Sequence, residues 1–249
     1  MRDISTGDRL RALIDPEAAT RAPSASAAAS EVEPRARVVA VAELPTRFGA
    51  FHLVAFQNDR DGNDHLAMVH GDVIGAEDLP TRVHSECLTG DVMGSLRCDC
   101  RDQLEEALRL LARQPRGLLL YLRQEGRGIG LVNKLRAYAL QEQGLDTVEA
   151  NLALGFRDDE RDYAVAASMI EALGVRSIGL MTNNPTKLGE LTRHGVKVTG
   201  RIAHAMPPNV HNRFYLETKA RRSGHMLDVR PGARVDRAAR VLAEARLLD

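Results

Sequence analysis

The chain has 249 residues, 44% of them hydrophobic, and its 34 Lys and Arg residues are balanced by 34 Asp and Glu residues. This length favours one large domain with a sizeable core, and the absence of net charge excludes a global attraction to nucleic acid or to a membrane surface. Because the sequence shows no secretory segment, no apolar run of about 18 residues and an odd number of cysteines, we expect a cytoplasmic protein.

Residues 1–36 are rich in Ala, Ser, Arg and Pro and show neither strand alternation nor a bounded amphipathic helix. This composition predicts a disordered leader, because it offers too little apolar surface to offset the entropy of ordering. Acidic residues such as Asp3, Glu17 and Glu31 argue against a transit peptide, which is poor in acids. We therefore expect the leader to be dispensable for activity and stability.

Order is predicted to begin at Arg37 with three short β-prone runs, VVAVAEL, FGAFHLVAFQ and HLAMVHGDV. Pro, Gly, Asn and Asp residues separate these runs, so they predict an antiparallel meander. The next run, RVHSECL, predicts a strand that ends beside the first cysteine. That cysteine would then lie at the rim of a sheet, where loops carry function.

The cysteines fall in one polar segment with the spacing C-x10-C-x-C, at Cys87, Cys98 and Cys100. Thiolates are soft ligands that suit zinc, and three protein ligands leave one tetrahedral position for water, as in a catalytic site. A helical period begins at Asp99, which places the last two cysteines near a helix N-terminus whose dipole favours thiolates. Two alternatives stay open: the cysteines are ordinary buried thiols, or His84 or His211 closes a structural site with four ligands.

A second site is predicted after the apolar run LLLYL, which is typical of a strand buried on both faces. The segment RQEGRGIG follows at once and leads into a helix that ends near Gln143. Amides of this turn, with the side chains of Arg123 and Arg127, would form a phosphate cradle at Gly126, Gly128 and Gly130. Alternatively, the turn merely connects a strand to a helix, and its G-x-G-x-G spacing supports a dinucleotide fold only weakly.

A further strand and helix are predicted in SIGLMTNNPTKLGELTRHGV, where Pro185 opens the helix and Lys187 in its first turn could reach a phosphate. A helix with an alanine-rich inner face precedes this unit over residues 164–173, and such alternation indicates a parallel half. We therefore predict a mixed α/β fold in a single compact domain over residues 37–228, with a β-rich N-terminal half followed by strand–helix units. A basic helix is expected in residues 211–227, and residues 229–249 are expected to form a charged tail without a role in the site.

Five motifs occur in the order in which they are found in one enzyme family: RVHSECLTGDVMGSLRCDC, YLRQEGRGIGL, DTVEAN, LGFRDDERDY and LMTNNPTK. Over residues 38–227 the sequence resembles GTP cyclohydrolase II, although Arg101 and Asp102 stand where that family commonly has a glycine and an apolar residue. The resemblance implies conversion of GTP to 2,5-diamino-6-ribosylamino-4(3H)-pyrimidinone 5′-phosphate, formate and pyrophosphate, the first step of riboflavin biosynthesis. It also implies a Zn²⁺ ion in each subunit, Mg²⁺ with the GTP phosphates, and a homodimer.

The resemblance further implies a role for each matching residue. It assigns the zinc ligands to Cys87, Cys98 and Cys100. It assigns attack on the α-phosphorus to Arg161 with Asp159 as proton acceptor, and it places Tyr138 near the base and the zinc water. The remaining matches are contacts to GTP, namely Arg82, Val83, His84, Ser85, Glu86, Gln103, Glu125, Gly126, Arg127, Thr147, Thr182 and Lys187.

Residue chemistry leaves alternatives beside these roles. A guanidinium is always protonated, so Arg161 suits an electrostatic clamp better than a nucleophile, and it could instead form a plain salt bridge with Asp159. Tyr138 could lie on the buried face of a helix. Two other functional hypotheses stay open: a hydrolase that opens the ring but retains the formyl group, and a nucleotide-binding regulator with structural zinc and no turnover.

Overall fold

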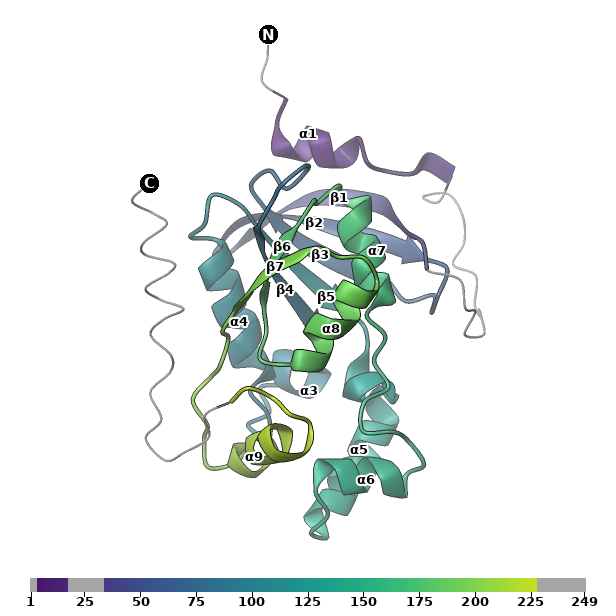
Figure 1. The fold of residues 1–249 in the computed structure, drawn as a ribbon, viewed down its shortest axis with the longest axis vertical. Helices are drawn as coiled ribbons and strands as arrows, with labels where there is room; N and C mark the ends of the chain where they lie inside the picture. The colour runs from purple at the N-terminus through teal and green to yellow at the C-terminus, as the bar shows by residue number, and fades with distance from the viewer. Residues whose placement is uncertain (1–3, 18–33, 228–249) are drawn as a thin grey trace.

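The computed structural model describes residues 4–17 and 34–227, and one seven-stranded sheet forms its centre (Figure 1). Across the sheet the strands follow the order β1-β2-β3-β5-β4-β6-β7. The strand bounds are Ala36–Thr46 for β1, Gly49–Asn58 for β2, His65–His70 for β3, Leu79–Ser85 for β4, Gly117–Leu122 for β5, Ile178–Met181 for β6 and Val198–Ile202 for β7.

The sheet has an antiparallel and a parallel part. Strands β1, β2 and β3 form the predicted antiparallel meander, and β3 pairs antiparallel with β5. From β5 through β4 and β6 to β7 every pair is parallel, which requires the crossover connections that the helices supply. The predicted β-rich half followed by strand–helix units is therefore confirmed.

Helices cover both faces of the sheet, and α5, α6 and α9 gather beyond one end of it (Figure 1). Within residues 4–17 and 34–227, no helix has the length and apolarity needed to cross a bilayer. The helix bounds are Thr6–Arg11 for α1, Leu88–Asp91 for α3, Cys100–Leu111 for α4, Glu125–Gly128 for the 3-10 helix η1, Gly130–Glu142 for α5, Thr147–Ala153 for α6, Ala164–Ala172 for α7, Pro185–Arg193 for α8 and Arg213–Arg222 for α9.

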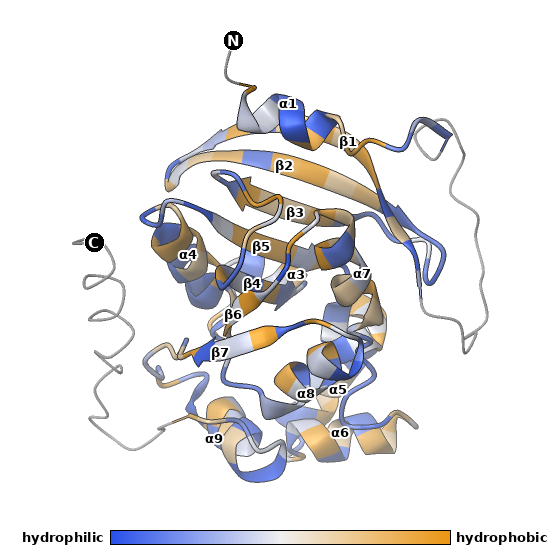
Figure 2. Cartoon of the chain, turned by 45° about the horizontal axis from the view of Figure 1, so that its top comes forward, coloured by the Kyte–Doolittle hydropathy of each residue, from blue (hydrophilic) through white to orange (hydrophobic). Residues whose placement is uncertain are grey.

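Strand β5 shows why its sequence is continuously apolar. Successive side chains of a strand point to opposite faces. Leu119 therefore packs with Leu108 of α4 in one core cluster, whereas Leu118 and Leu120 join Met169 of α7 in the larger cluster on the other face. Figure 2 shows the hydrophobic colour concentrated along the strands of the sheet. Burial on both faces leaves the polar chemistry to the strand ends.

The prediction that residues 1–36 form a disordered leader is wrong for the described residues 4–17. Helix α1 forms there, and the hydroxyl of Ser5 caps it by accepting the Asp8 N–H at 3.2 Å. The side chain of Leu10 is only 1% exposed and belongs to the main core. After the helix, Ile14 forms a bridge with Val38 of β1. A short apolar face buried against the sheet offsets the entropy of ordering this segment, although the composition of the whole leader hides it. Residues 18–33 and the predicted tail lie outside the described residues.

The carboxyl ends of β4, β5 and β6 lie at the same edge of the sheet because these strands are parallel. The segments that follow them begin at Glu86, Arg123 and Thr182, and they contain most of the motifs identified in the sequence. Ligands of open α/β sheets bind at this edge. The fold therefore predicts where the motifs converge.

Candidate active site

A cavity of about 270 Å³ opens at the carboxyl edge of β4, β5 and β6. Of the residues to which the family resemblance assigns a role, all line this cavity except Val83 and Asp159. Val83 is fully buried in the core, and its carbonyl accepts a hydrogen bond from Lys187 Nζ at 2.6 Å. Asp159 lies behind the lining and holds Arg161. The structure thus brings together segments that span more than a hundred positions of the chain.

Three sulfur atoms meet on one side of the cavity. The Sγ atoms of Cys87, Cys98 and Cys100 all lie within 4.8 Å of one another, and the first two are 3.6 Å apart. Tetrahedral zinc with Zn–S bonds of about 2.3 Å requires sulfurs about 3.8 Å apart. The backbone of Gly90 packs against this group, because a Cβ there would lie 2.8 Å from Cys98 Sγ. Three converging soft donors fit a zinc ion.

Asp91 organises the segment that follows β4. Its buried carboxylate accepts hydrogen bonds from the Cys87 N–H at 3.0 Å, the Tyr121 hydroxyl at 2.8 Å and His84 Nε2 at 3.1 Å. Burial lowers the pKa of His84, so the imidazole is neutral. In the described part of the chain, the group of candidate metal ligands consists of the three thiols. The alternative of a structural site closed by His84 or His211 therefore has no support there, and the cysteines face the open cavity.

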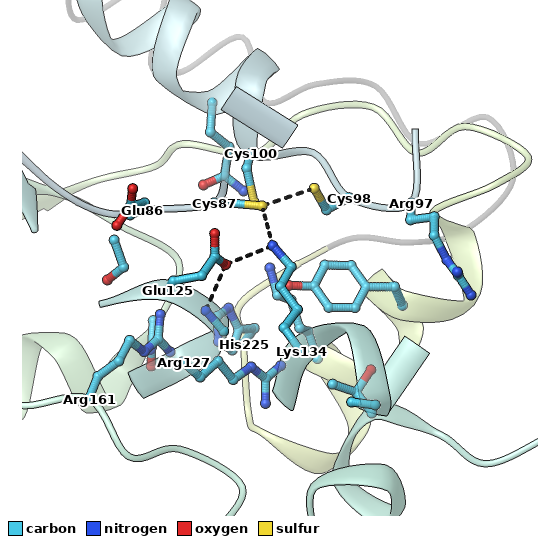
Figure 3. Close-up of a pocket in the computed structure, with 18 of the residues that line it drawn as sticks. Glu86, Cys87, Arg97, Cys98, Cys100, Glu125, Arg127, Lys134, Arg161 and His225 are labelled. Atoms are coloured by element: carbon cyan, nitrogen blue, oxygen red, sulfur yellow. Dashed lines mark hydrogen bonds and ion pairs between the residues drawn. The ribbon is translucent and has the colours of Figure 1, made fainter. Parts of the chain in front are cut away.

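Lys134 connects the thiols to the turn after β5. Its ammonium donates to Cys87 Sγ at 3.1 Å and to Glu125 Oε1 at 2.7 Å (Figure 3). Hydrogen bonds with Cys100 and Cys98, followed by the charge of Lys134, hold the pKa of the Cys87 thiol far below its usual range. The cysteine segment therefore contains a site for a thiolate beside a fixed cation.

Cationic side chains gather on another side of the cavity. Both carboxylate oxygens of Asp159 accept hydrogen bonds from the Arg161 guanidinium, one of them from Nε at 2.8 Å. Arg82 donates to the Met181 carbonyl at 2.9 Å. Burial, with Arg82 and Arg161 nearby, lowers the pKa of Lys187 well below its usual range, and the carboxylate of Asp159 opposes this shift only in part. This arrangement is suited to bind a polyanion.

Buried polar atoms without a hydrogen-bond partner concentrate around the cavity. Native proteins leave few such atoms, and each calls for an explanation. Within residues 4–17 and 34–227 each of them belongs to a lining residue, to its sequence neighbour, or to Tyr163, whose ring lies beneath Arg161 and Lys187. These atoms are Arg82 Nε, His84 Nδ1, Ser85 Oγ, Asp99 Oδ1, Gln124 Oε1, Tyr163 Oη and Asn212 Nδ2. A polar ligand would supply the missing partners.

Tyr138 faces the cavity and not the core. It lies on α5 one turn after Lys134, its hydroxyl is 3.5 Å from Thr89 Oγ1, and the guanidinium of Arg97 stacks 4.4 Å from its ring centroid. Burial raises the pKa of Tyr138 to about 12, so the phenol remains protonated and can donate a hydrogen bond. The alternative of a buried core tyrosine is therefore wrong.

The glycine turn only partly forms the predicted phosphate cradle. Gly126 and Arg127 both have a φ near +60° and line the main cavity. Gly128, Gly130 and Arg123 instead line a second cavity, where Arg123 lies 3.8 Å from Glu86. These three residues therefore lie on a different side of the connection that follows β5 than Gly126 and Arg127 do. The predicted phosphate contact by Arg123 is therefore not supported.

Several lining residues were not identified from the sequence. Residues 203–227, which include α9, cover the cavity, and Lys219 lies 3.8 Å from Asp99 between the two later cysteines. The spacing of Lys134 and Tyr138 on one helix face could have revealed the lysine. Arg97, Asn183 and Asn184 lie inside the quoted motifs, whereas no local pattern marks the lining residues after position 203. The residues missed include Arg97, Lys134, Asn183, Asn184, His204, Tyr215, Lys219 and His225.

Comparison with known proteins gives a consistent result. The profile of the GTP cyclohydrolase II family matches residues 36–203. The chain is 58% identical over 185 residues to GTP cyclohydrolase-2 of Picrophilus torridus, covering 74% of this chain and 96% of that protein. It is 53% identical over 191 residues to GTP cyclohydrolase-2 of Proteus mirabilis, covering 77% and 96%. It is also 53% identical to riboflavin biosynthesis protein RibBA of Bacillus mycoides, covering 75% of this chain but 47% of that longer protein.

Proposed function

Because the chain belongs to the GTP cyclohydrolase II family, we propose that it hydrolyses GTP to 2,5-diamino-6-ribosylamino-4(3H)-pyrimidinone 5′-phosphate, formate and pyrophosphate, as the first step of riboflavin biosynthesis. One observation carries the proposal: a site of three thiols and a cluster of buried cations face the same cavity. The thiols suit an ion that activates water, and the cations suit a triphosphate. Hydrolysis of a purine nucleoside triphosphate at its ring needs both groups at once, the ion for the ring and the cations for the phosphates.

Zinc is the metal that the donor set favours, with Cys87, Cys98 and Cys100 as its ligands. When bound there, it would supply a Lewis acid that activates water at neutral pH for hydrolysis of the purine ring. Magnesium usually accompanies substrate phosphates and takes few protein ligands. We therefore expect it to enter with GTP.

The chain's own residues divide the remaining work. Arg82, Arg161 and Lys187 would bind the phosphates, with Asp159 fixing the plane of the Arg161 guanidinium. Although burial opposes it, the nearby Tyr163 and Asp159 raise the pKa of Arg161 above its usual value. A permanently protonated guanidinium favours an electrostatic clamp on the α-phosphate over a nucleophile. The phenol of Tyr138 would donate a hydrogen bond near the reacting base.

The other predicted contacts lie on the same cavity wall. Gln103 and Ser85 are within the lining, and Thr147 opens α6 directly after its cap Asp146. Thr182 follows β6 and is 1% exposed. We propose these as contacts to the nucleotide, and we propose a cytoplasmic homodimer, as the sequence resemblance implies. The names of the relatives give no support to a formyl-retaining hydrolase.

Product analysis tests the proposal. Zinc-loaded protein is incubated with GTP and Mg²⁺, and formate, pyrophosphate and the pyrimidine are quantified separately. Equal amounts of formate and pyrimidine, with pyrophosphate, are expected. A formamidopyrimidine without free formate would show that the ring is opened but not deformylated. Binding of GTP without any product would indicate a regulator.

A further inference from the structure

Lys134 is buried between two parts of the site that are separate in sequence. Its side chain is 10% exposed, and Nζ reaches Cys87 Sγ at 3.1 Å on one side and Glu125 Oε1 at 2.7 Å on the other (Figure 3). Neither the sequence motifs nor the family resemblance assigned this lysine a role. A buried ammonium is stable only when it is paired and hydrogen-bonded. Here its partners are a metal-ligand sulfur and a carboxylate.

Glu125 is largely occupied by partners within the protein. Its Oε2 accepts the Leu88 N–H at 2.6 Å, and its Oε1 accepts both the Gly126 N–H at 2.7 Å and the ammonium of Lys134. Leu88 directly follows Cys87. The contacts therefore close a ring that runs from the sulfur through Lys134 and Glu125 back to the cysteine segment.

The ring connects the metal site to the nucleotide wall. Glu125 opens the turn whose next residues, Gly126 and Arg127, line the main cavity, and both adopt the left-handed region. A non-glycine residue at positive φ, such as Arg127, needs surrounding contacts that hold it there. The side chain of Arg127 is held by Asp158, and the carboxylate of Glu125, fixed by Lys134, accepts the N–H of Gly126 directly before it. The sulfur of Cys87 is thus joined to the turn through the two hydrogen bonds of Lys134.

Charge explains why a cation lies at this point. With a divalent ion bound, three thiolates would exceed its charge by one unit, and Glu125 would add another negative charge at the same place. The ammonium of Lys134 offsets this excess directly at a ligand sulfur. An ordinary Lys–Glu ion pair would account for the contact with Glu125 but not for the second contact with Cys87.

We propose that Lys134 is a positioning residue that couples the metal centre to the nucleotide-binding turn; the proposal rests on the function proposed above. Its ammonium stabilises Cys87 as a metal ligand and holds Glu125, and with it Gly126 and Arg127, against the cavity. Groups that hydrogen-bond to metal ligands change metal affinity by about 10–100-fold when they are removed. Lys134 acts through Cys87 and Glu125 and is not itself assigned to the chemical step.

The test compares Lys134→Met, which keeps the length of the side chain but removes the charge, with Lys134→Arg, which keeps a cation. Lys197→Met is the matched control, because Lys197 directly precedes β7, is exposed and does not line the main cavity. Zinc affinity is measured by competition with a chromogenic chelator. We expect a loss of about 10–100-fold for Lys134→Met, a smaller loss for Lys134→Arg and no change for the control.

A second measurement separates coupling from a general loss of stability. In Co²⁺-substituted protein, the sulfur-to-cobalt charge-transfer band should move to lower energy in Lys134→Met, because a sulfur without its cationic donor is richer in electrons. Binding of a non-hydrolysable GTP analogue to the zinc-saturated variant should also weaken, since the turn loses its anchor. If Lys134→Met does not fold, Lys134→Gln replaces it under the same criteria, because it keeps a donor but no charge.

The outcomes distinguish this inference from the proposed function. Wild-type zinc affinity and an unchanged cobalt band in the neutral variant would overturn the role of Lys134, even if the protein converts GTP as proposed. If the Lys134 variant shows changed zinc affinity and a shifted cobalt band but the wild-type protein releases no formate, only the proposed function is overturned. Neither measurement depends on turnover.

Discussion

The antiparallel meander and the carboxyl edge of the parallel strands use burial in opposite ways. In the meander, Val54, Phe56 and Val69 are at most 1% exposed and contact other apolar side chains. At the carboxyl edge, Arg82, Thr182 and Lys187 are at most 6% exposed although all three are polar or charged. The same sheet therefore has an apolar core along its strands and a buried polar cavity at the carboxyl ends of its parallel strands.

This difference between the two regions determines which side chains can be substituted without loss of function. Apolar burial is proportional to area and is not directional, so the meander best tolerates apolar side chains of similar volume. Polar burial is stable only with specific partners, and several buried atoms at the carboxyl edge have no hydrogen-bond partner among the described residues. Substitutions in the meander should reduce stability, whereas substitutions at the edge should reduce activity.

The largest effect is expected for Cys98→Ser, which removes one of three thiols with almost no change in volume. Formate release should fall below detection and bound zinc should drop, while the circular dichroism spectrum stays that of the wild type. Metal analysis and formate assays check this. Full zinc occupancy with a normal formate yield would show that Cys98 is an ordinary buried thiol.

The opposite result is expected for Phe56→Ala in the meander. Removing this side chain, which is 1% exposed in the main core, should reduce the free energy of unfolding by about 3–5 kcal/mol. Denaturant unfolding measures the loss. The fraction that remains folded should convert GTP with an unchanged kcat, and a specific loss of kcat would contradict the separation of the two regions.

Arg161→Ala should slow pyrophosphate release on the order of 10²–10³-fold, the effect of removing one electrostatic stabiliser of developing charge. Arg161→Lys keeps the charge but loses the planar fork that Asp159 holds, so it separates charge from geometry. Arg157→Ala, at a side chain that is 78% exposed, is the control. Paired assays of pyrophosphate and formate are required. Wild-type pyrophosphate release by Arg161→Ala would leave the Arg161–Asp159 pair with a structural role only.

Leu10→Ala tests whether α1 belongs to the apolar region. Because Leu10 is 1% exposed, its truncation should cost about 2–3 kcal/mol of unfolding free energy. Ile4→Ala, at a side chain that is 71% exposed, should change it by less than about 0.5 kcal/mol. Equal thermal and denaturant stability of the two variants would restore the original expectation of a dispensable leader.

The smallest effect concerns pH. Burial lowers the pKa of His204 from 6.5 to about 3, and its Nε2–H donates to the Gln103 carbonyl at 2.8 Å. Between these values the unfolded chain binds the proton and the folded protein does not, so stability falls as the pH drops from 6.5 toward 3. Relative to wild type, His204→Gln should lose about 2 kcal/mol less between pH 7 and pH 5. The free energy of unfolding of both proteins is measured at the two pH values. An equal loss between pH 7 and pH 5 in the two proteins would contradict this assignment.

The sequence by itself determined the features that depend on near neighbours. Alternation and apolar runs predicted β1 to β6, because the period of a strand or helix is set within a few residues. The spacing of Cys87, Cys98 and Cys100 indicated a metal site, and Pro185 after Asn184 marked the start of α8, where the Asn184 side chain accepts the Thr186 N–H. Motif order was sufficient to identify the family.

Only the tertiary structure decided the contacts between distant segments. His204 meets Gln103 across 101 positions and Lys134 meets Cys87 across 47, so no local pattern could have shown either contact. The docking of α1, the exclusion of Arg123 from the main cavity and the covering of that cavity by residues 203–227 belong to the same class. These three features depend on the extent of the sheet and on the side of the sheet from which each crossover leaves. Burial, charge and hydrogen-bond partners are set by neighbours in space, which the sequence alone does not show.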